Sequence, residues 1–311
     1  MALAFVFPGQ GSQFVGMGAA LADAFPVARE VFQEVDDALG QKLFQLMREG
    51  PIEDLTLTTN TQPALMAHSI AVMRVLETEA GADVSNAMFV AGHSLGEYSA
   101  LCAARAISLG DTARLLRIRG EAIKAAAPVG MGAMAALIGV DIEGAQKAID
   151  AAPGKGVCEI ANDNAPGQVV ISGEKARVEA VCAGAKTFGA KIAKLLPVSA
   201  PFHSSLMAPA AARMADALAE TKISAPSTTL VANVTAKDVA NPASIRDLLV
   251  KQVTGRVRWT QSVEHMAAEG CDAFVEIGAG KVLSGLIKRI ARDTTTLNVG
   301  EPGDIEAFVK L

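Results

Sequence analysis

The pentapeptide Gly92-His93-Ser94-Leu95-Gly96 is the feature that most constrains the fold of this chain. It follows an apolar run at 87–91 and precedes a helix-like stretch at 97–105. A serine between two glycines, on a sharp turn from a strand into a helix, holds its hydroxyl clear of the backbone. Amide groups at the helix start can then stabilise an oxyanion. The pattern predicts Ser94 as a nucleophile in an α/β fold; the alternative is a serine that only caps a helix.

Outside the middle of the chain, apolar strands alternate with helical patterns. This alternation predicts a mainly parallel sheet flanked by helices. We expect strands at 3–7, 87–91, 228–234, 272–277 and 294–299. We expect helices at 16–25, 61–79 (with Pro63 in its first turn), 97–105, 111–127, 204–220, 244–253, 260–269 and 281–292.

Residues 129–197 break this rhythm. They predict strands at 133–140, 157–161, 168–172 and 190–196, with helices at 141–151 and 174–188 and a turn at 162–167. The order β-α-β-β-α-β is that of a ferredoxin-like unit. We therefore expect an inserted ferredoxin-like subdomain at 129–197 in a discontinuous core made of 1–128 and 198–311.

Composition limits which classes of partner the chain is expected to bind. Its 311 residues suffice for one large domain or two lobes, and half of them are hydrophobic. The net charge of −5 argues against nucleic acid as a partner. Neither a signal peptide nor a membrane-spanning run is evident, so we expect a cytoplasmic protein with no membrane partner. The four cysteines lie far apart and lack zinc-like spacing, which predicts free thiols and no metal site.

A serine nucleophile needs a base, and the chain has four histidines. His203 lies between a strand and a helix, where site residues concentrate, and it is the favoured general base. The alternative is a histidine that merely precedes a helix. His68 and His265 fall in amphipathic helices, where packing roles are expected, and His93 adjoins Ser94 on a turn that points neighbouring side chains apart.

The third member of a catalytic triad is missing from the pattern. Hydrolases of this kind place an acid between the serine and the histidine in chain order. The candidates Asp111, Asp141, Asp150 and Asp163 do not follow a strand of the main sheet. We expect a Ser94–His203 pair oriented by neutral acceptors, which counts against a simple esterase.

Arg119 lies in the apolar arc of the helix at 111–127, while Arg114, Arg117 and Lys124 fall on the opposite face. A buried guanidinium needs an anionic partner. Two alternatives remain open on physical grounds. The partner is either a carboxylate of the protein, or the carboxylate of a substrate that the planar fork of the arginine would bind.

The turn Gly9-Gln10-Gly11-Ser12-Gln13 follows the first strand, at the edge where α/β sheets bind ligands. It has neither the Gly-Lys-Ser/Thr of a phosphate-binding loop nor the third glycine of a dinucleotide fingerprint. Its free amides suit an oxyanion hole, formed by the N–H groups of Gln10 and Leu95.

Together these motifs resemble the malonyl-CoA:acyl carrier protein transacylases, the acyltransferases of bacterial fatty-acid synthesis, over nearly the whole chain. The resemblance rests on residues 7–13, 61–64, 92–98, 119–120, 162–168, 201–204, 251–252 and 276–281. Members of that family have an α/β hydrolase-like core with an inserted ferredoxin-like lobe. Gly278-Ala279-Gly280 departs from the Gly-Pro-Gly common in relatives, and we expect no effect of this change.

The resemblance implies a role for each matching residue. Ser94 would be the nucleophile and His203 its base, and Gln10 and Leu95 would form the oxyanion hole. Arg119 would bind the malonyl carboxylate, which favours the substrate alternative above.

It also implies supporting roles. Gln252 would orient His203 through its backbone carbonyl, in place of the missing acid. Asn162 and Gln62 would line the site, and Phe202 directly before the histidine goes with a preference for malonyl over methylmalonyl groups.

The activity implied is a ping-pong transfer of malonyl from malonyl-CoA to the phosphopantetheine thiol of an acyl carrier protein, with coenzyme A thioester as substrate and no permanently bound cofactor. The alternatives are a serine thioesterase or carboxylesterase of related fold, and a carrier-protein-binding scaffold with a degenerate site. We expect a monomer that binds the acidic carrier protein transiently. The candidate basic surfaces are Lys281, Lys288 and Arg289, or Lys186, Lys191 and Lys194.

Overall fold

The computed structural model describes residues 2–128, 130–198 and 200–311. Within them, the larger sheet consists of β1 (Leu3–Phe7), β2 (Phe89–Gly92), β7 (Thr229–Ala232), β8 (Lys237–Val239), β9 (Ala273–Ile277) and β10 (Thr295–Val299). The strands lie in the order β10-β9-β1-β2-β7-β8, and every neighbouring pair is parallel except β7 and β8. The predicted α/β class with a mainly parallel sheet is confirmed.

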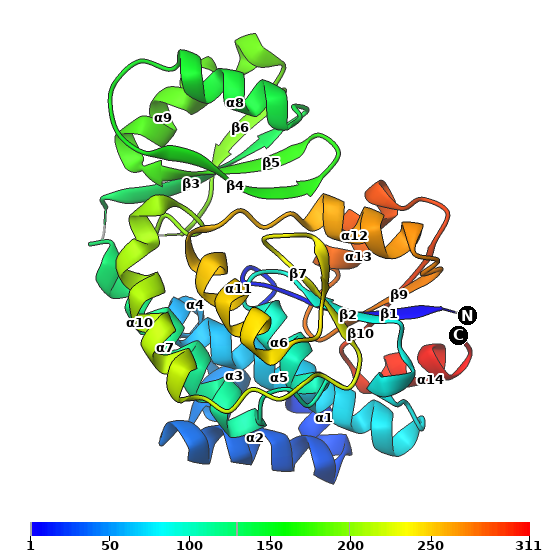
Figure 1. The fold of residues 1–311 in the computed structure, drawn as a ribbon. Coiled ribbons are helices and arrows are strands. Elements are labelled where there is room, and N and C mark those ends of the chain that lie inside the picture. The colour runs from blue at the N-terminus through cyan, green and yellow to red at the C-terminus, as the bar shows by residue number, and fades with distance from the viewer. Residues whose placement is uncertain (1, 129, 199) are drawn as a thin grey trace.

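Helices cover both faces of this sheet (Figure 1). In β1, Ala4 and Val6 contact a core formed with α12 (Trp259–Ala268) and α13 (Val282–Ile290), whereas Phe5 and Phe7 face the opposite core. Burial on both faces explains why these strands are apolar throughout. The helices of the opposite core are α1 (Ala19–Ala24), α2 (Pro26–Leu39), α3 (Leu43–Glu49), α4 (Ile52–Thr56), α5 (Thr58–Glu79), α6 (Gly96–Ala103), α7 (Leu109–Ala126), α10 (Ala208–Glu220), α11 (Pro242–Thr254) and α14 (Ile305–Val309).

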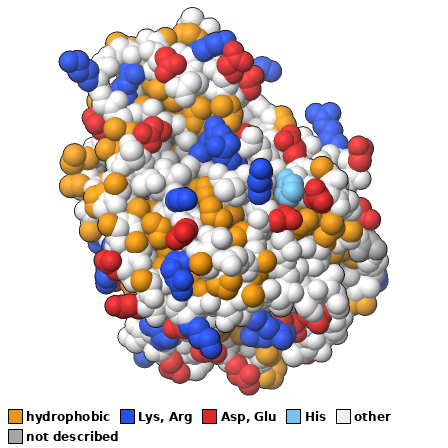
Figure 2. Space-filling model, viewed as in Figure 1, with side chains coloured by type: hydrophobic (Ala, Val, Ile, Leu, Met, Phe, Trp, Pro, Cys, Tyr) orange, Lys and Arg blue, Asp and Glu red, His pale blue; other side chains and the backbone are white. Residues whose placement is uncertain are grey.

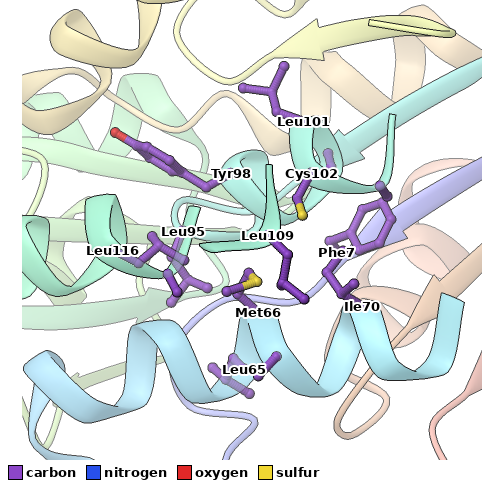
Figure 3. Close-up of a cluster of buried hydrophobic side chains, with 14 of the residues drawn as sticks. Phe7, Leu65, Met66, Ile70, Leu95, Tyr98, Leu101, Cys102, Leu109 and Leu116 are labelled. Carbon is purple, nitrogen blue, oxygen red and sulfur yellow. The ribbon is translucent and has the colours of Figure 1, made fainter. Parts of the chain in front are cut away.

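The centre of the larger core lies beside the serine turn. Figure 3 shows Leu65 and Met66 of α5 among the side chains of Leu95, Leu109 and Leu116. Leu95, which directly follows Ser94, is only 1% exposed. Burying a leucine side chain contributes about 1.5–3 kcal/mol, so this contact anchors the turn that carries the serine.

A second sheet is antiparallel and lies above the first in Figure 1. It consists of β3 (Gly132–Ile138), β4 (Cys158–Ala165), β5 (Gln168–Glu174) and β6 (Ile192–Leu195), in the order β4-β5-β3-β6. The helices α8 (Ile142–Ala151) and α9 (Lys175–Gly184) pack on one face. The other face presents Met134, Ala161 and Val170 toward Phe202. The predicted boundary residue Val129, and Ser199 in the loop before His203, lie outside the described residues.

The turn predicted at 162–167 is present but shorter, because it consists of Pro166 and Gly167 alone. Strand β4 continues through Ala165, so Asn162 is a strand residue. The segment at Val257 pairs with this part of β4: the Asp163 amide donates to the Val257 carbonyl at 2.9 Å, and the Val257 amide donates to Ala161 at 2.8 Å. The same run also pairs with β5, with register shifts between Ile160 and Asn162 and between Asp163 and Ala165. Because the run is polar and its pairing is irregular, it reads as a loop when taken alone.

Other differences concern elements that the sequence analysis does not predict. The helices α2, α3 and α4 occupy residues 26–56, and β8 and α14 are additional short elements. The helix predicted from 61 starts at Thr58, which places Pro63 inside it rather than in its first turn. The remaining predicted elements are present with shifted ends, and the helix predicted at 174–188 divides into α9 and a 3₁₀ turn.

Further observations concern single residues. The four cysteines are free thiols, as predicted. In the ranges that the structure covers, every helix is too short or too polar to cross a bilayer. His265 is packed in part, as expected: its ring lies 6.1 Å from that of buried Phe89, and its Nε2 lies 2.6 Å from Asp238 Oδ1.

The motif at 276–281 holds helix α13. Both carboxylate oxygens of buried Glu276 accept backbone N–H groups of that helix, from Leu283 at 3.0 Å and Ser284 at 2.7 Å. A carboxylate at a helix N-terminus satisfies otherwise unpaired donors. Glu276 therefore has a structural role at the start of α13 and, among the described residues, no contact with the serine site that would suggest a catalytic one.

His68 is fully buried, as its predicted packing role requires. Its Nε2 lies 3.0 Å from the Gly300 carbonyl oxygen and ties α5 to the segment after β10. Burial lowers the pKa of His68 from 6.5 to about 4. As the pH decreases, His68 of the unfolded chain takes up a proton near pH 6.5, whereas in the folded protein it does so only near pH 4. The free energy of unfolding therefore decreases as the pH is lowered from about 6.5 to 4.

We expect His68→Gln to flatten the acid limb of stability. Relative to pH 7, wild type should lose about 2–3 kcal/mol more than the variant at pH 4.5, because glutamine does not titrate. Urea unfolding at the two pH values measures the difference. An equal acid-induced loss in both proteins would contradict this role, and a lower stability of the variant at pH 7 would leave the comparison valid.

Candidate active site

The serine turn is as sharp as its glycines suggest. Ser94 adopts a left-handed φ of 54°, between the end of β2 at Gly92 and the start of α6 at Gly96. A Cβ on Gly92 would lie 1.9 Å from the Gly96 carbonyl carbon, and one on Gly96 would lie 2.2 Å from the Phe7 oxygen. Both positions therefore require glycine.

Asn233, which follows β7, holds the turn from the neighbouring strand. Its Oδ1 accepts the Ser94 amide at 2.8 Å, and its Nδ2 donates to the Gly92 carbonyl at 2.6 Å. Asn233 is not among the residues predicted from the sequence. Its position directly after an apolar strand of the parallel sheet is the signal that could have indicated it.

His203 lies against the serine. The Ser94 Oγ is 2.8 Å from His203 Nε2, and His203 Nδ1 lies 2.9 Å from the Gln252 carbonyl and 3.1 Å from that of Gly255. Carbonyls only accept, so Nδ1 carries the proton and Nε2 presents its lone pair to Ser94. Burial, with a contribution from nearby Arg119, lowers the pKa of His203 to about 3, so the imidazole is neutral.

Arg119 of α7 is 2% exposed, as predicted from its place on the helix. Its Nη1 donates to Gln62 Oε1 at 2.7 Å, and its Nη2 donates to Gln252 Oε1 at 3.0 Å and to Ser94 Oγ at 3.1 Å. No carboxylate of the described residues lies within ion-pair distance of the guanidinium. The protein itself therefore leaves this buried charge without a counter-ion.

The carboxyl group of Glu97 is the nearest buried acid in this network. It is 0% exposed, and its Oε2 accepts Gln252 Nε2 at 2.6 Å and the Asn233 amide at 3.3 Å. Gln252 thus stands between the carboxyl and Arg119, and burial raises the pKa of Glu97 to about 7. The sequence analysis assigns no role to Glu97, although an acid placed in the first turn after the serine elbow is a usable signal.

The amides of Gln10 and Leu95 are the candidate oxyanion donors. Neither amide donates a hydrogen bond to another residue that the structure describes. Unpaired N–H groups are free to bind an anion, and that of Leu95 also lies at the start of α6, whereas that of Gln10 lies in the turn after β1. The Gln10 side chain, in contrast, is held, because its Oε1 accepts the Thr58 hydroxyl at 3.1 Å.

These groups surround one cavity of about 300 Å³ between the two sheets. Of the residues singled out from the sequence, Gln62 and Gln252 lie behind its wall and reach it through Arg119, while the others line it: Gln10, Ser94, Leu95, Arg119, Asn162, Phe202 and His203. His93 also lines the cavity but bonds to Asn164 Oδ1 at 2.8 Å, away from the partner of Ser94. No cluster of metal-ligating side chains occurs among the described residues.

The two glycine clashes generate a test that needs no substrate. Gly92→Ala should lower the free energy of unfolding by about 3 kcal/mol, because its Cβ overlaps backbone that cannot move aside. It should also abolish labelling of Ser94 by a serine-directed phosphonate.

The matched control is Gly285→Ala in α13, where a Cβ meets nothing within 4 Å. This variant should gain about 0.5–1 kcal/mol from helix propensity and label normally. Thermal unfolding and intact mass report both effects. Normal labelling of Gly92→Ala would contradict the close packing of the turn.

Comparison with known proteins agrees with this geometry. The model of the acyl transferase domain family matches residues 4–300. The malonyl CoA-acyl carrier protein transacylase of Escherichia coli strain K12 is 47% identical over 308 residues, which cover 99% of each chain. The crystal structure of an acyl-carrier-protein S-malonyltransferase from Bartonella henselae matches with a TM-score of 0.97 at 54% identity, over 100% of this chain and 99% of that one.

A further solved structure holds a malonyl-transacylase in complex with a type II polyketide synthase acyl-carrier protein. It matches with a TM-score of 0.96 at 41% identity, over 100% of this chain and 99% of that one. Family model, sequence and fold agree over almost the full length, and the chain belongs to the malonyl-CoA:acyl carrier protein transacylase family of acyl transferase domains.

Proposed function

We propose that this chain is an [acyl-carrier-protein] S-malonyltransferase, which moves malonyl from malonyl-CoA to the phosphopantetheine thiol of an acyl carrier protein in fatty acid biosynthesis. The observation that carries the proposal is Arg119, a buried cation without a protein counter-ion that donates to Ser94 Oγ itself. A thioester with a carboxylate close to its carbonyl suits that charge and the nucleophile together. The names of the relatives agree with this substrate.

The first half-reaction forms an ester on Ser94. His203 Nε2 takes the proton of Ser94 Oγ as that oxygen bonds to the thioester carbonyl carbon, and the carbonyl electron pair moves onto oxygen. The amides of Gln10 and Leu95 bind the oxyanion. When the carbonyl re-forms, the C–S bond breaks, and the coenzyme A thiolate takes the proton from His203.

The second half-reaction reverses these steps with a new thiol. His203 Nε2 takes the proton of the phosphopantetheine thiol while the sulfur attacks the malonyl-serine carbonyl. Collapse breaks the bond to Ser94 Oγ, which recovers the proton from His203. His203 takes part in every proton transfer, and the acyl group is carried as an ester of Ser94. The sequence of steps therefore needs no permanently bound cofactor.

The substrate carboxylate also assists the base. The charge of Arg119 disfavours an imidazolium at His203 and contributes to its lowered pKa. A malonyl carboxylate paired with Arg119 cancels that charge and raises the basicity of His203 when substrate is present. Gln252 keeps the Nδ1 proton in place through its carbonyl, and Asn162, Phe202 and Gln62 shape the site around the acyl group.

The alternative of a thioesterase or carboxylesterase is less well supported. His203 contacts backbone carbonyls rather than a carboxylate in the described residues, and Arg119 has no role in the hydrolysis of neutral esters.

We also propose the domain division stated above, with a ferredoxin-like insert at 129–197 on a hydrolase-like core of 1–128 and 198–311. The strand order β4-β5-β3-β6, with α8 and α9 on one face, supports it. Exposed apolar side chains such as Met131, Ile192 and Val309 lie on separate segments, which favours a monomer. A cytoplasmic location follows from the proposed coenzyme A thioester substrate.

The carrier protein is proposed to dock through local positive charge. Figure 2 shows basic and acidic side chains interspersed over one face of the molecule. Arg289 donates to Gln168 Oε1 at 2.6 Å and to the Pro166 carbonyl at 2.7 Å, so it already joins α13 to the β4–β5 hairpin. Lys281 and Lys288, or Lys186, Lys191 and Lys194 on the smaller unit, are therefore cleaner positions for charge reversal.

The proposed activity is tested by intact mass after mixing with malonyl-CoA and then with phosphopantetheinylated carrier protein. We expect one malonyl adduct that is absent in Ser94→Ala and moves to the carrier thiol. Loss of the adduct to water at the same rate with or without carrier protein would instead indicate a hydrolase.

Substitution of Arg119 tests the carboxylate anchor. Arg119→Ala should slow acylation by malonyl-CoA by about 10²–10⁴-fold, corresponding to about 3–5 kcal/mol for a lost partner of a buried charge. Acylation by acetyl-CoA should fall much less. Arg114→Ala, on the exposed face of the same helix, is the matched control and should behave as wild type. Equal losses with both thioesters would contradict the anchor role.

The lowered pKa of His203 predicts the pH profile. Because Nε2 stays unprotonated until the pH approaches the folded pKa of about 3, kcat/KM for acylation should be flat from pH 8 to 5 in Glu97→Gln, where the buried acid with a pKa of about 7 no longer titrates. Stopped-flow pH jumps measure the rate before acid unfolding intervenes. An acid limb centred near pH 6.5 in this variant would show that His203 titrates as an ordinary histidine.

A further inference from the structure

A chain of hydrogen bonds runs from Arg119 to Gln10 along the start of α5. Arg119 Nη1 donates to Gln62 Oε1 at 2.7 Å, and Gln62 Nε2 donates to Thr58 Oγ1 at 2.9 Å. The Thr58 hydroxyl in turn donates to Gln10 Oε1 at 3.1 Å. The chain thus joins the cation proposed to bind the substrate carboxylate to the residue whose amide is proposed to bind the oxyanion.

The direction of every bond in this chain follows from its first member. A guanidinium can only donate, so the oxygen of the Gln62 amide must face it. The Gln62 nitrogen then faces Thr58 and donates to it, which leaves the Thr58 proton for Gln10. The orientation of the Gln10 side chain is therefore set by a charge at the other end of the network.

Gln10 has little else to hold it. Within the described residues the contact with Thr58 is the one hydrogen bond that Gln10 makes. Its neighbour Gly11 adopts a φ of 108°, a conformation open to few residues other than glycine, and the Gly11 amide donates to Gln13 Oε1 at 2.7 Å within the same loop. Thr58 does not cap α5 with its side chain and does not line the cavity that holds Ser94. Its hydroxyl serves the Gln10 contact and the Gln62 contact only.

We propose that Thr58 is a positioning residue, which through its hydroxyl fixes the Gln10 loop so that the Gln10 amide meets the oxyanion. It touches neither substrate nor reacting atoms, and it acts on Gln10. The inference rests on the proposed function, and it extends that function by coupling the recognition of the carboxylate to the alignment of the oxyanion hole.

The test compares Thr58→Val, which removes the hydroxyl and keeps the shape, with Thr58→Ser, which keeps the hydroxyl. The control is Thr59→Val, the same change one residue later, at a threonine whose side chain makes no hydrogen bond in the described residues. Single-turnover acylation by malonyl-CoA is followed by quench and intact mass. Removal of an oxyanion donor costs about 10²–10³ in rate, so a misaligned donor should cost about tenfold.

We expect Thr58→Val to lower the maximal acylation rate about tenfold without changing the half-saturating malonyl-CoA concentration. Thr58→Ser should restore the rate, and Thr59→Val should match wild type, with equal thermal midpoints for both valine variants. In a Gln10→Ala background, which keeps the backbone amide, Thr58→Val should have no further effect.

Three results would overturn the inference: wild-type acylation by Thr58→Val, failure of Thr58→Ser to restore the rate, or an undiminished effect of Thr58→Val in the Gln10→Ala background. Wild-type enzyme that takes no malonyl group at all would contradict the proposed function instead, so the two failures are distinguishable.

Discussion

The buried guanidinium of Arg119 is the constraint on which the site depends. A guanidinium donates hydrogen bonds and accepts none, so each group around it must present an oxygen. Gln62 and Gln252 both do so, and each amide then directs its nitrogen outward. For Gln252 the nitrogen meets the Ser94 carbonyl and the Glu97 carboxylate, which only accept. The guanidinium of Arg119 therefore sets the orientation of two side-chain amides, Gln62 and Gln252, near Ser94.

The same charge has an electrostatic cost that the fold does not relieve. Burial without a counter-ion lowers the pKa of Arg119 itself, and the charge disfavours protonation of His203. The carboxyl group of Glu97 does not contact Arg119, because the Gln252 side chain lies between them. A site with an unneutralised cation beside its nucleophile binds an anionic acyl group better than a neutral one. Under the proposed function, selectivity for the substrate and assistance to His203 would come from this one interaction.

The second sheet completes the cavity and contributes neither Ser94 nor His203. Ser94 and His203 come from the larger part of the chain, whereas Met134, Asn162 and Val170 close the cavity from the smaller sheet. The open face of that sheet meets Phe202, one residue before His203. Bonds between β4 and Val257 hold the two sheets together beside the cavity, so the polar strand residues contribute both to the wall and to the junction.

The sequence by itself determined the features that depend on local geometry. The glycines around Ser94 and the apolar arc around Arg119 are readable because a turn and a helical period involve neighbouring residues. Tertiary structure decided the rest, because the partners are distant in the chain: Asn233 beside the serine turn, Gln252 beside Glu97, Thr58 beside Gln10, and Val257 beside a run that reads as a loop. Helix α2 could have been predicted from periodicity, since Val31, Phe32 and Val35 bury one face. The strand at Asn162 could not, because its residues are polar, its pairing with β5 is irregular, and its other neighbour lies almost a hundred residues away. Which distant residues form hydrogen bonds depends on how the helices and strands pack, and a periodic pattern in the sequence does not show that packing.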